Sequence, residues 1–293
     1  IIYMESPAAV GYSYAAADYD YDDNSTASDN LAALLDWFQR FPDYSNHSFF
    51  ITGESYGGIY VPTLAYKIDR YNVNPTAGKI NLKGFGVGNG VTDYRFDNDD
   101  AGMDFYWNHD LYSPPLREEY EANCMGDEND PSCQDTMAKI ANLTENLALN
   151  IYDIYKPCYY SMSNASHEEL KGATFDYLRF KRPVNSSKYG IDPDRGNVPG
   201  APKCLDSNGS YIWLNDPKNR EALHIKNPID GGALNKTWYM CVMDGPFNYT
   251  KNPNASYWVY PLMINKGYKI VIYSGSTDGS VPIIGTKRWL EQL

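Results

Sequence analysis

The feature that most constrains the fold is the stretch 48–58, where an apolar, β-prone run leads into Gly53-Glu54-Ser55-Tyr56-Gly57 and then a helix-compatible segment. A Gly-x-Ser-x-Gly pattern between a strand and a helix is typical of a nucleophile elbow, a tight turn on which the serine hydroxyl projects outward. The backbone N–H of Tyr56, at the positive end of the following helix, would stabilise an oxyanion formed on an attacked carbonyl. The pattern therefore predicts a nucleophile, Ser55, on an α/β scaffold.

Strand-like runs alternate with helical patterns along the chain, at 1–4, 49–52, 82–87 and 268–273. A helix is expected from Leu31 to Phe41, where apolar residues recur at helical spacing after a cap at Ser28 or Asp29. This alternation predicts a mostly parallel sheet covered by helices on both faces. The acidic stretch 18–23 is expected to be a solvated loop.

From about Met103 the sequence becomes rich in cysteine, aspartate, tyrosine and short broken helical segments. We therefore expect three parts: an N-terminal core over 1–102, a cap insertion over 103–207, and a C-terminal core over 208–293. Asp216 followed by Pro217 predicts a helix start in the third part. A chain of 293 residues is long enough for one α/β domain with such an insertion.

The net charge of −12 argues against nucleic acid or an anionic membrane as a partner. No apolar run approaches the length of a membrane span, so a soluble protein is expected. No cysteine or histidine spacing matches a zinc site, and neither a metal nor a cofactor is predicted. Asn-x-Ser/Thr sequons, each a possible glycosylation acceptor, indicate the secretory pathway as a set. They begin at Asn24, Asn46, Asn142, Asn164, Asn185, Asn208, Asn235, Asn248 and Asn254.

The serine needs an acid and a histidine, which follow it in that order in α/β-hydrolases. The late run 269–273 is followed by a Gly/Ser-rich turn that contains Asp278, the natural acid. No histidine follows Asp278, because His47, His109, His167 and His224 all precede it. His224, on the helix begun by Asp216, is a substitute, whereas the other three look like surface residues. Since the chain also opens like the middle of a strand, we expect a fragment truncated at both ends, with the base beyond Leu293.

Four segments in order resemble the serine carboxypeptidases, the acidic lysosomal and vacuolar exopeptidases built on the α/β-hydrolase fold. They are Ile2–Tyr14, Gly53–Gly58 with Tyr60-Val61-Pro62, Leu82–Gly90, and the Asp278 turn continuing to Gly285, Thr286 and Trp289. The resemblance covers essentially the whole chain and is weaker in the insertion. Ser276 departs from the family pattern, which usually has aspartate there, and this affects the support of the acid turn.

The resemblance implies Ser55 as nucleophile, Asp278 as triad acid, and Tyr56 as both oxyanion donor and wall of the S1 pocket. Glu54 would bind the substrate's terminal carboxylate, which it repels when ionised and binds when protonated. Binding would then be tight at acidic pH and lost as pH rises. Ser280 and Val281 would line the S1 side.

The resemblance also implies pairings for the five cysteines. Cys124 would bond to Cys133 and Cys158 to Cys204, whereas Cys241 would pair with a cysteine upstream of Ile1. On the residues alone, the odd count means that one thiol is unpaired or has a partner outside the sequence.

The implied activity is release of C-terminal amino acids from peptides at acidic pH through an acyl-enzyme, in a secreted, lysosomal or vacuolar protein. An acyltransferase on the same scaffold and a catalytically inactive binding or protective protein remain alternatives, as does a homodimeric assembly. A lipase or esterase would not need Glu54. A nucleotide loop at 84–90 is disfavoured, because the glycines miss the Gly-x-Gly-x-x-Gly spacing.

Overall fold

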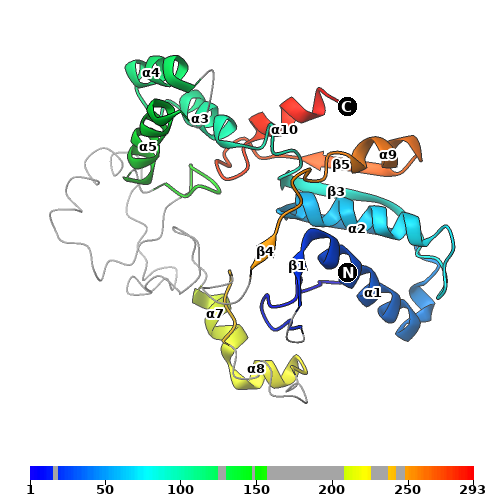
Figure 1. The fold of residues 1–293 in the computed structure, drawn as a ribbon. Coiled ribbons are helices and arrows are strands. Elements are labelled where there is room, and N and C mark those ends of the chain that lie inside the picture. Colours follow the sequence, from blue (N-terminus) through cyan, green and yellow to red (C-terminus); the bar gives the residue numbers. More distant parts are fainter. Residues whose placement is uncertain (16–18, 125–129, 147–148, 157–207, 226–236, 242–247) are drawn as a thin grey trace. The chain divides into compact units, whose positions relative to one another are not determined.

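The computed structural model describes residues 1–15, 19–124, 130–146, 149–156, 208–225, 237–241 and 248–293 (Figure 1). The chain divides into two compact units. Unit 1 comprises Ile1–Phe105 and Asp244–Leu293, and unit 2 comprises Tyr106–Met243. Unit 2 thus extends beyond the expected insertion, 103–207, at its C-terminal side.

A three-stranded parallel sheet, in the order β2-β3-β5, is the centre of unit 1 (Figure 1). The strands are β2 (Phe49–Ser55), β3 (Leu82–Gly90) and β5 (Lys269–Tyr273). Three of the predicted strand-like runs are therefore strands. Because the strands are parallel, their carboxyl ends and the segments that follow lie at one edge of the sheet.

Helices pack on one face of this sheet and form the core with it. They are α1 (Asp23–Arg40), α2 (Gly57–Tyr71), α9 (Val259–Asn265) and α10 (Ile283–Leu290). Phe85 and Val87 of β3 point into this core, where the ring centroids of Phe85 and Tyr260 lie 5.5 Å apart and those of Tyr260 and Trp289 lie 5.1 Å apart. Truncation of such a buried aromatic side chain costs about 3–5 kcal/mol of folding free energy.

The opposite face of the sheet is open among the described residues. Phe50, Val271 and Tyr273, which alternate with the core positions, are 48%, 60% and 52% exposed. The prediction that helices cover both faces is therefore wrong for the described part of the chain. Alternation of side chains along a strand reveals two faces, but it does not say which of them is covered.

The first predicted strand, at 1–4, is not a strand in the structure. Its residues are β-prone, yet Ile1 and Tyr3 are exposed and the segment joins no ladder among the described residues. Strand propensity does not fix a strand unless a neighbour supplies hydrogen bonds.

The first helix begins about two turns earlier than predicted. Asp22 caps α1 by accepting a hydrogen bond from the backbone N–H of Ser25 at 2.6 Å, so neither Ser28 nor Asp29 is the cap. Asp23 is buried in the first turn, and the prediction of a solvated loop is therefore wrong at this end of the stretch. The residues before the helix form β1 (Tyr21–Asp22), which pairs in parallel with β4 (Tyr249–Thr250).

The regular secondary structure in the described parts of unit 2 is helical. The described helices that lie wholly in unit 2 are α4 (Pro114–Cys124), α5 (Pro131–Asn146), α7 (Asn208–Asn215) and α8 (Pro217–Ala222). Helix α3 (Asp99–Asn108) crosses the boundary between the units. The short 3₁₀ turn η1 (Pro42–Tyr44) belongs to unit 1. Asp216 caps α8 as predicted, accepting from the backbone N–H groups of Lys218 and Asn219.

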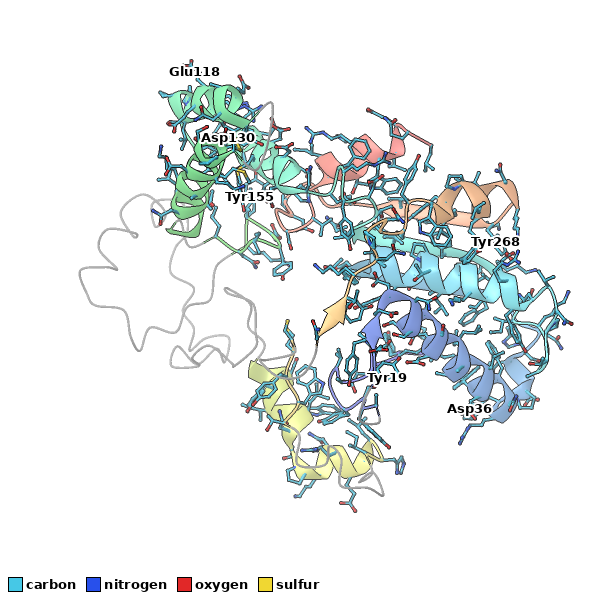
Figure 2. The ribbon with its side chains drawn as sticks, in the orientation of Figure 1. Tyr19, Asp36, Glu118, Asp130, Tyr155 and Tyr268 are labelled. Carbon is cyan, nitrogen blue, oxygen red and sulfur yellow. A yellow bond between two sulfur atoms is a disulfide. The ribbon has the colours of Figure 1, made fainter. Side chains whose placement is uncertain are left out.

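The predicted Cys124–Cys133 disulfide joins α4 to α5, with a Cα–Cα distance of 4.8 Å (Figure 2). Cys241 is an exposed free thiol. The predicted Cys158–Cys204 pair lies outside the described residues. Within the part of the chain that the structure describes, no helix combines the length and apolar character of a membrane span.

Candidate active site

Ser55 lies on a strained turn between β2 and α2. It is the last residue of β2, its φ is +60°, and its side chain is exposed. A non-glycine residue with positive φ is uncommon and is found preferentially at functional sites. The helix approaches the sheet closely, because a Cβ at Gly58 would lie 2.3 Å from the carbonyl oxygen of Val91. This geometry is that of the predicted nucleophile elbow, with the hydroxyl at the carboxyl edge of the sheet.

Tyr56 follows Ser55 and is the N-cap of α2. Its backbone N–H belongs to the first turn of the helix, where N–H groups have no partner within the helix itself. The side chain is half-buried, and its hydroxyl donates to Asp23 at 3.0 Å. Burial raises the pKa of the Tyr56 phenol, so the hydroxyl remains a donor.

Ser55, Glu54 and Tyr56 line one groove of about 910 Å³, which runs along the edge of β2. The other wall is formed by residues 1–4, by the middle and C-terminal part of α1 and by the first half of α2. The side chain of Glu54 is exposed at this edge. Ser280 and Val281 do not line the groove: Ser280 is exposed and Val281 is buried in the turn after β5.

Asp278 lies in the turn after β5, at the same edge of the sheet as Ser55. Its Oδ1 accepts from the backbone N–H groups of Ser280 at 2.7 Å and Val281 at 3.3 Å. Burial raises the pKa of the Asp278 carboxyl, the two N–H groups oppose this shift, and the nearby charge of Glu54 adds to it. Asp278 is thus a half-buried carboxyl that is influenced by the charge of Glu54.

Asn89, at the end of β3, connects these two segments and was not singled out from the sequence. It lies between the strand that carries Ser55 and the strand that precedes Asp278. Its Nδ2 donates to Ser274 Oγ at 3.2 Å and to the carbonyl of Val281 at 3.3 Å. The sequence signal that could have identified Asn89 is its position between two glycines at the end of a predicted strand. In the structure Asn89 takes a φ of +38°, a conformation that asparagine adopts more readily than most residues.

The histidines do not complete a triad within unit 1. His47 is exposed and precedes the amino end of β2, whereas Ser55 is at the carboxyl end of that strand. His109 and His224 belong to unit 2, and His224 is exposed just beyond α8 with a φ of +56°. His167 lies outside the described residues.

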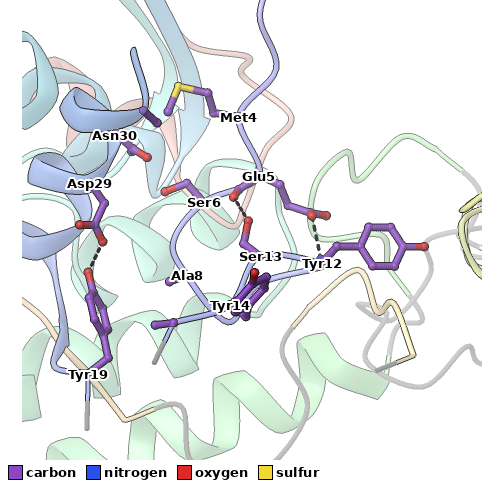
Figure 3. Close-up of a pocket in the computed structure, with 12 residues that line it drawn as sticks. Met4, Glu5, Ser6, Ala8, Tyr12, Ser13, Tyr14, Tyr19, Asp29 and Asn30 are labelled. Atoms are coloured by element: carbon purple, nitrogen blue, oxygen red, sulfur yellow. Dashed lines mark hydrogen bonds between the residues drawn. The ribbon is translucent and has the colours of Figure 1, made fainter. Parts of the chain in front are cut away.

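A second pocket, of about 720 Å³, lies between the turn of residues 5–14 and the side of α1 (Figure 3). Glu5 organises the turn, because its Oε2 accepts from the backbone N–H of Tyr12 at 2.7 Å and its carbonyl accepts from the Ser13 hydroxyl. Ser55 does not line this pocket. Ile2, Tyr3, Met4 and Ser6 of the first family-like motif line the groove that contains Ser55, whereas the turn that follows them lines this second pocket.

Five of the predicted glycosylation acceptors are exposed where the structure describes their side chains: Asn24, Asn46, Asn142, Asn248 and Asn254. Exposure is required for a bulky glycan. Among the described residues no group of three or more histidine, cysteine, aspartate or glutamate side chains could hold a metal ion.

Comparison with known proteins gives consistent results. The family model described as serine carboxypeptidase matches residues 1–293. The chain is 33% identical to serine carboxypeptidase-like 20 of Arabidopsis thaliana and 30% identical to the lysosomal protective protein of Mus musculus, in both cases over 100% of this chain and 62% of the relative. The chain thus spans about 62% of the length of these curated relatives.

The fold is also found among solved structures. A prohormone-processing carboxypeptidase from Saccharomyces cerevisiae superposes with a TM-score of 0.62 over 99% of this chain and 58% of its own. The two sequences are 17% identical, so this likeness concerns the fold alone. Together with the parallel sheet and its helices, it identifies the α/β-hydrolase fold.

Proposed function

The chain belongs to the serine carboxypeptidase family, and on this basis we propose that it contributes Ser55 and Asp278 to an enzyme that releases C-terminal amino acids from peptides. The observation that carries the proposal is the exposed Ser55, held at a φ of +60° on the sheet edge where Asp278 also lies. A nucleophile and an acid at one edge of a parallel sheet are the arrangement that acyl transfer needs.

In the proposed reaction the Ser55 hydroxyl attacks the carbonyl carbon of the last peptide bond while an imidazole takes its proton. The tetrahedral oxyanion accepts a hydrogen bond from the Tyr56 backbone N–H, which the preceding turn holds in place. The imidazole then protonates the leaving amine, and water attacks the remaining ester to release the shortened peptide. Asp278 fixes the imidazole and stabilises its positive charge.

We propose that the imidazole comes from a segment beyond Leu293. His47, the one histidine in the residue ranges of unit 1, lies before β2, a strand of seven residues that separates it from Ser55. At about 3.3 Å per residue the strand places the two residues roughly 20 Å apart, which is too far for proton transfer. The two histidines of unit 2 that lie among the described residues, His109 and His224, are the alternatives that experiment must test.

Glu54 is proposed to bind the terminal carboxylate of the substrate. It is exposed in the groove one residue before Ser55, and its charge acts on Asp278. A protonated Glu54 can donate a hydrogen bond to the substrate, while an ionised one repels it. Glu54→Gln, which always offers a hydrogen-bond donor and does not repel the carboxylate, should therefore give an equal or lower KM than wild type.

The decisive experiment uses the protein that carries this chain together with the segments its relatives have beyond it. Release of the C-terminal residue from a blocked dipeptide at about pH 5 should be detected and should be abolished by Ser55→Ala. Transfer of the acyl group from an activated ester to an alcohol, without hydrolysis, would favour an acyltransferase. An absence of both reactions, with Ser55 unreactive toward a fluorophosphate, would favour an inactive binding protein.

The cellular compartment of the protein can be inferred from its glycosylation sequons and its disulfide. We propose that the protein passes through the secretory pathway to the outside, a lysosome or a vacuole, which suits an acidic pH optimum. Exposed sequons and a disulfide between Cys124 and Cys133 support an oxidising route. Endoglycosidase treatment that leaves the apparent mass of the natural protein unchanged would contradict it.

A further inference from the structure

Asp23 is a buried carboxylate that the proposed mechanism leaves without a role. It stands in the first turn of α1 and is only 3% exposed. Burial of a carboxylate is costly unless hydrogen bonds compensate the lost hydration. The positive end of the helix contributes part of that compensation, and the rest comes from three donors that belong to distant segments.

Two phenols and one backbone amide hold the Asp23 carboxylate. Its Oδ1 accepts from the hydroxyls of Tyr56 at 3.0 Å and Tyr249 at 2.8 Å, and its Oδ2 accepts from the backbone N–H of Asn252 at 2.6 Å. Hydrogen bonds to an ionised acceptor are about twice as strong as those between neutral groups. The carboxylate therefore fixes the directions of both phenols.

These hydrogen bonds of Asp23 join three segments: the start of α1, the nucleophile elbow, and residues 249–252, where the chain has returned from unit 2 into unit 1. The short β1–β4 pairing, with Tyr21 opposite Tyr249, holds the first and third of these in register. Tyr56 is the residue after Ser55, so its ring lines the groove directly beside the turn that carries the nucleophile. Asp23 is thus one buried group that contacts both the returning chain and the elbow.

The same contacts build an aromatic cluster next to Ser55. The ring centroid of Tyr56 lies 4.9 Å from that of Tyr60 and 6.1 Å from that of Tyr249. Tyr56 and Tyr60 line the groove that also contains Ser55. Aromatic rings at such spacing offer a wall of apolar faces and edges against which a large apolar side chain can pack.

We propose that Asp23 is a positioning residue that orients Tyr56 and thereby sets the preference for the side chain on the amino side of the cleaved bond. This inference rests on the proposed function. Without the carboxylate, the Tyr56 ring loses its fixed direction, and the wall no longer matches a large side chain. A small side chain makes little use of that wall, so its cleavage should depend much less on Asp23.

The test compares Asp23→Asn and Tyr56→Phe with wild type in the full-length protein, and uses Asp29→Asn as the matched control. Asp29 is on the same helix and also accepts a phenol, that of Tyr19 (Figure 3), but it is exposed and does not line the groove that contains Ser55. Two blocked dipeptides that differ only in phenylalanine or alanine before the cleaved bond give two values of kcat/KM. The rate at which diisopropyl fluorophosphate labels Ser55 measures the reactivity of the Ser55 hydroxyl. Because this reagent carries no amino-acid side chain, the rate does not depend on the side-chain preference of the groove.

Both test variants should lower the phenylalanine-to-alanine ratio of kcat/KM by about 10-fold, within the range that one altered pocket contact produces. Labelling should stay within about 2-fold of wild type, and Asp29→Asn should change neither quantity. An unchanged ratio would overturn the inference. It is also overturned if both substrates and the labelling rate fall by one common factor, because Asp23 would then only support the fold.

A failure of the proposed function gives a different pattern. In that case wild type itself neither cleaves the dipeptides nor reacts with the fluorophosphate. The link between Asp23 and Tyr56 is then measured by urea unfolding of both single variants and the double variant. Non-additive effects would uphold the positioning contact, whereas additive effects would overturn it.

Discussion

Asn89 Oδ1 accepts a hydrogen bond from the backbone N–H of Gly275 at 3.0 Å, and this contact joins the end of β3 to the turn that carries Asp278. The same side chain donates through Nδ2 to Ser274 and Val281 in that turn. One amide therefore uses both its acceptor and its donors to hold the acid turn against the strand next to Ser55.

Asn89→Ala should release this turn. The variant loses hydrogen bonds from partly buried backbone groups, so unfolding should become easier by about 1–3 kcal/mol. Because Asp278 would also lose its fixed position, kcat should fall on the order of 10- to 100-fold with a smaller effect on KM. Urea unfolding and steady-state kinetics of the full-length protein measure the two effects. Asn81→Ala, which removes an exposed contact to the Asn46 carbonyl, is the control and should leave kcat unchanged.

The positive φ of Ser55 predicts that a glycine at this position gives a more stable protein than an alanine. A glycine is favoured at a φ of +60°, where a Cβ costs about 1–2 kcal/mol. Ser55→Gly should therefore be more stable than Ser55→Ala by about 1 kcal/mol, although both abolish hydrolysis. Urea unfolding of the two variants measures the difference, and an alanine variant that is equally or more stable would show that the turn is relaxed.

The positions of Ser55 and Asp278 could be predicted because each depends on a local pattern. The elbow is a strand, a glycine-flanked serine and a helix in immediate succession, and the acid follows a late strand. The sheet edge then brings them together, since parallel strands end on the same side.

The contacts that Asn89 and Asp23 make could not be predicted in this way. Gly275 is 186 residues from Asn89 in the sequence, and Asn252 is 229 residues from Asp23. Nothing local to either residue indicates these partners. The sequence predicts a solvated loop at Asp23, because the first turns of α1 carry polar residues and the apolar periodicity starts only at Leu31.

Removal of the histidines of unit 2 tests the proposed source of the catalytic base. His224→Ala and His109→Ala should each keep kcat/KM for the blocked dipeptide within about 2-fold of wild type, since neither is assigned to the triad. Removal of a true base costs several orders of magnitude in kcat. A loss of that size in either variant, with an unchanged thermal unfolding midpoint, would place the base in unit 2 and not beyond Leu293.

The buried carboxyl of Asp97 should make the free energy of unfolding depend on pH, and this effect does not involve catalysis. Its Oδ2 accepts from the backbone N–H groups of Thr92 at 2.7 Å and Asp93 at 3.1 Å, whereas its buried Oδ1 has no hydrogen-bond partner among the described residues. Burial raises the pKa of the Asp97 carboxyl from 3.8 to about 6, although both N–H groups oppose the shift.

The sign of the effect follows from proton binding. Between pH 4 and pH 6 the folded state keeps the Asp97 proton while the unfolded state loses it, so the free energy of unfolding falls as the pH rises through this window. A shift of this size corresponds to about 2–3 kcal/mol, with little further loss above pH 7. Asp97→Asn keeps an acceptor for the Thr92 and Asp93 amides but cannot ionise, so the urea midpoint of this variant should fall less than that of wild type between pH 4 and pH 7. Asp43→Asn, an exposed carboxylate in η1, should follow wild type. If wild type and Asp97→Asn show parallel profiles, Asp97 ionises equally in both states and the burial of Oδ1 has no energetic consequence.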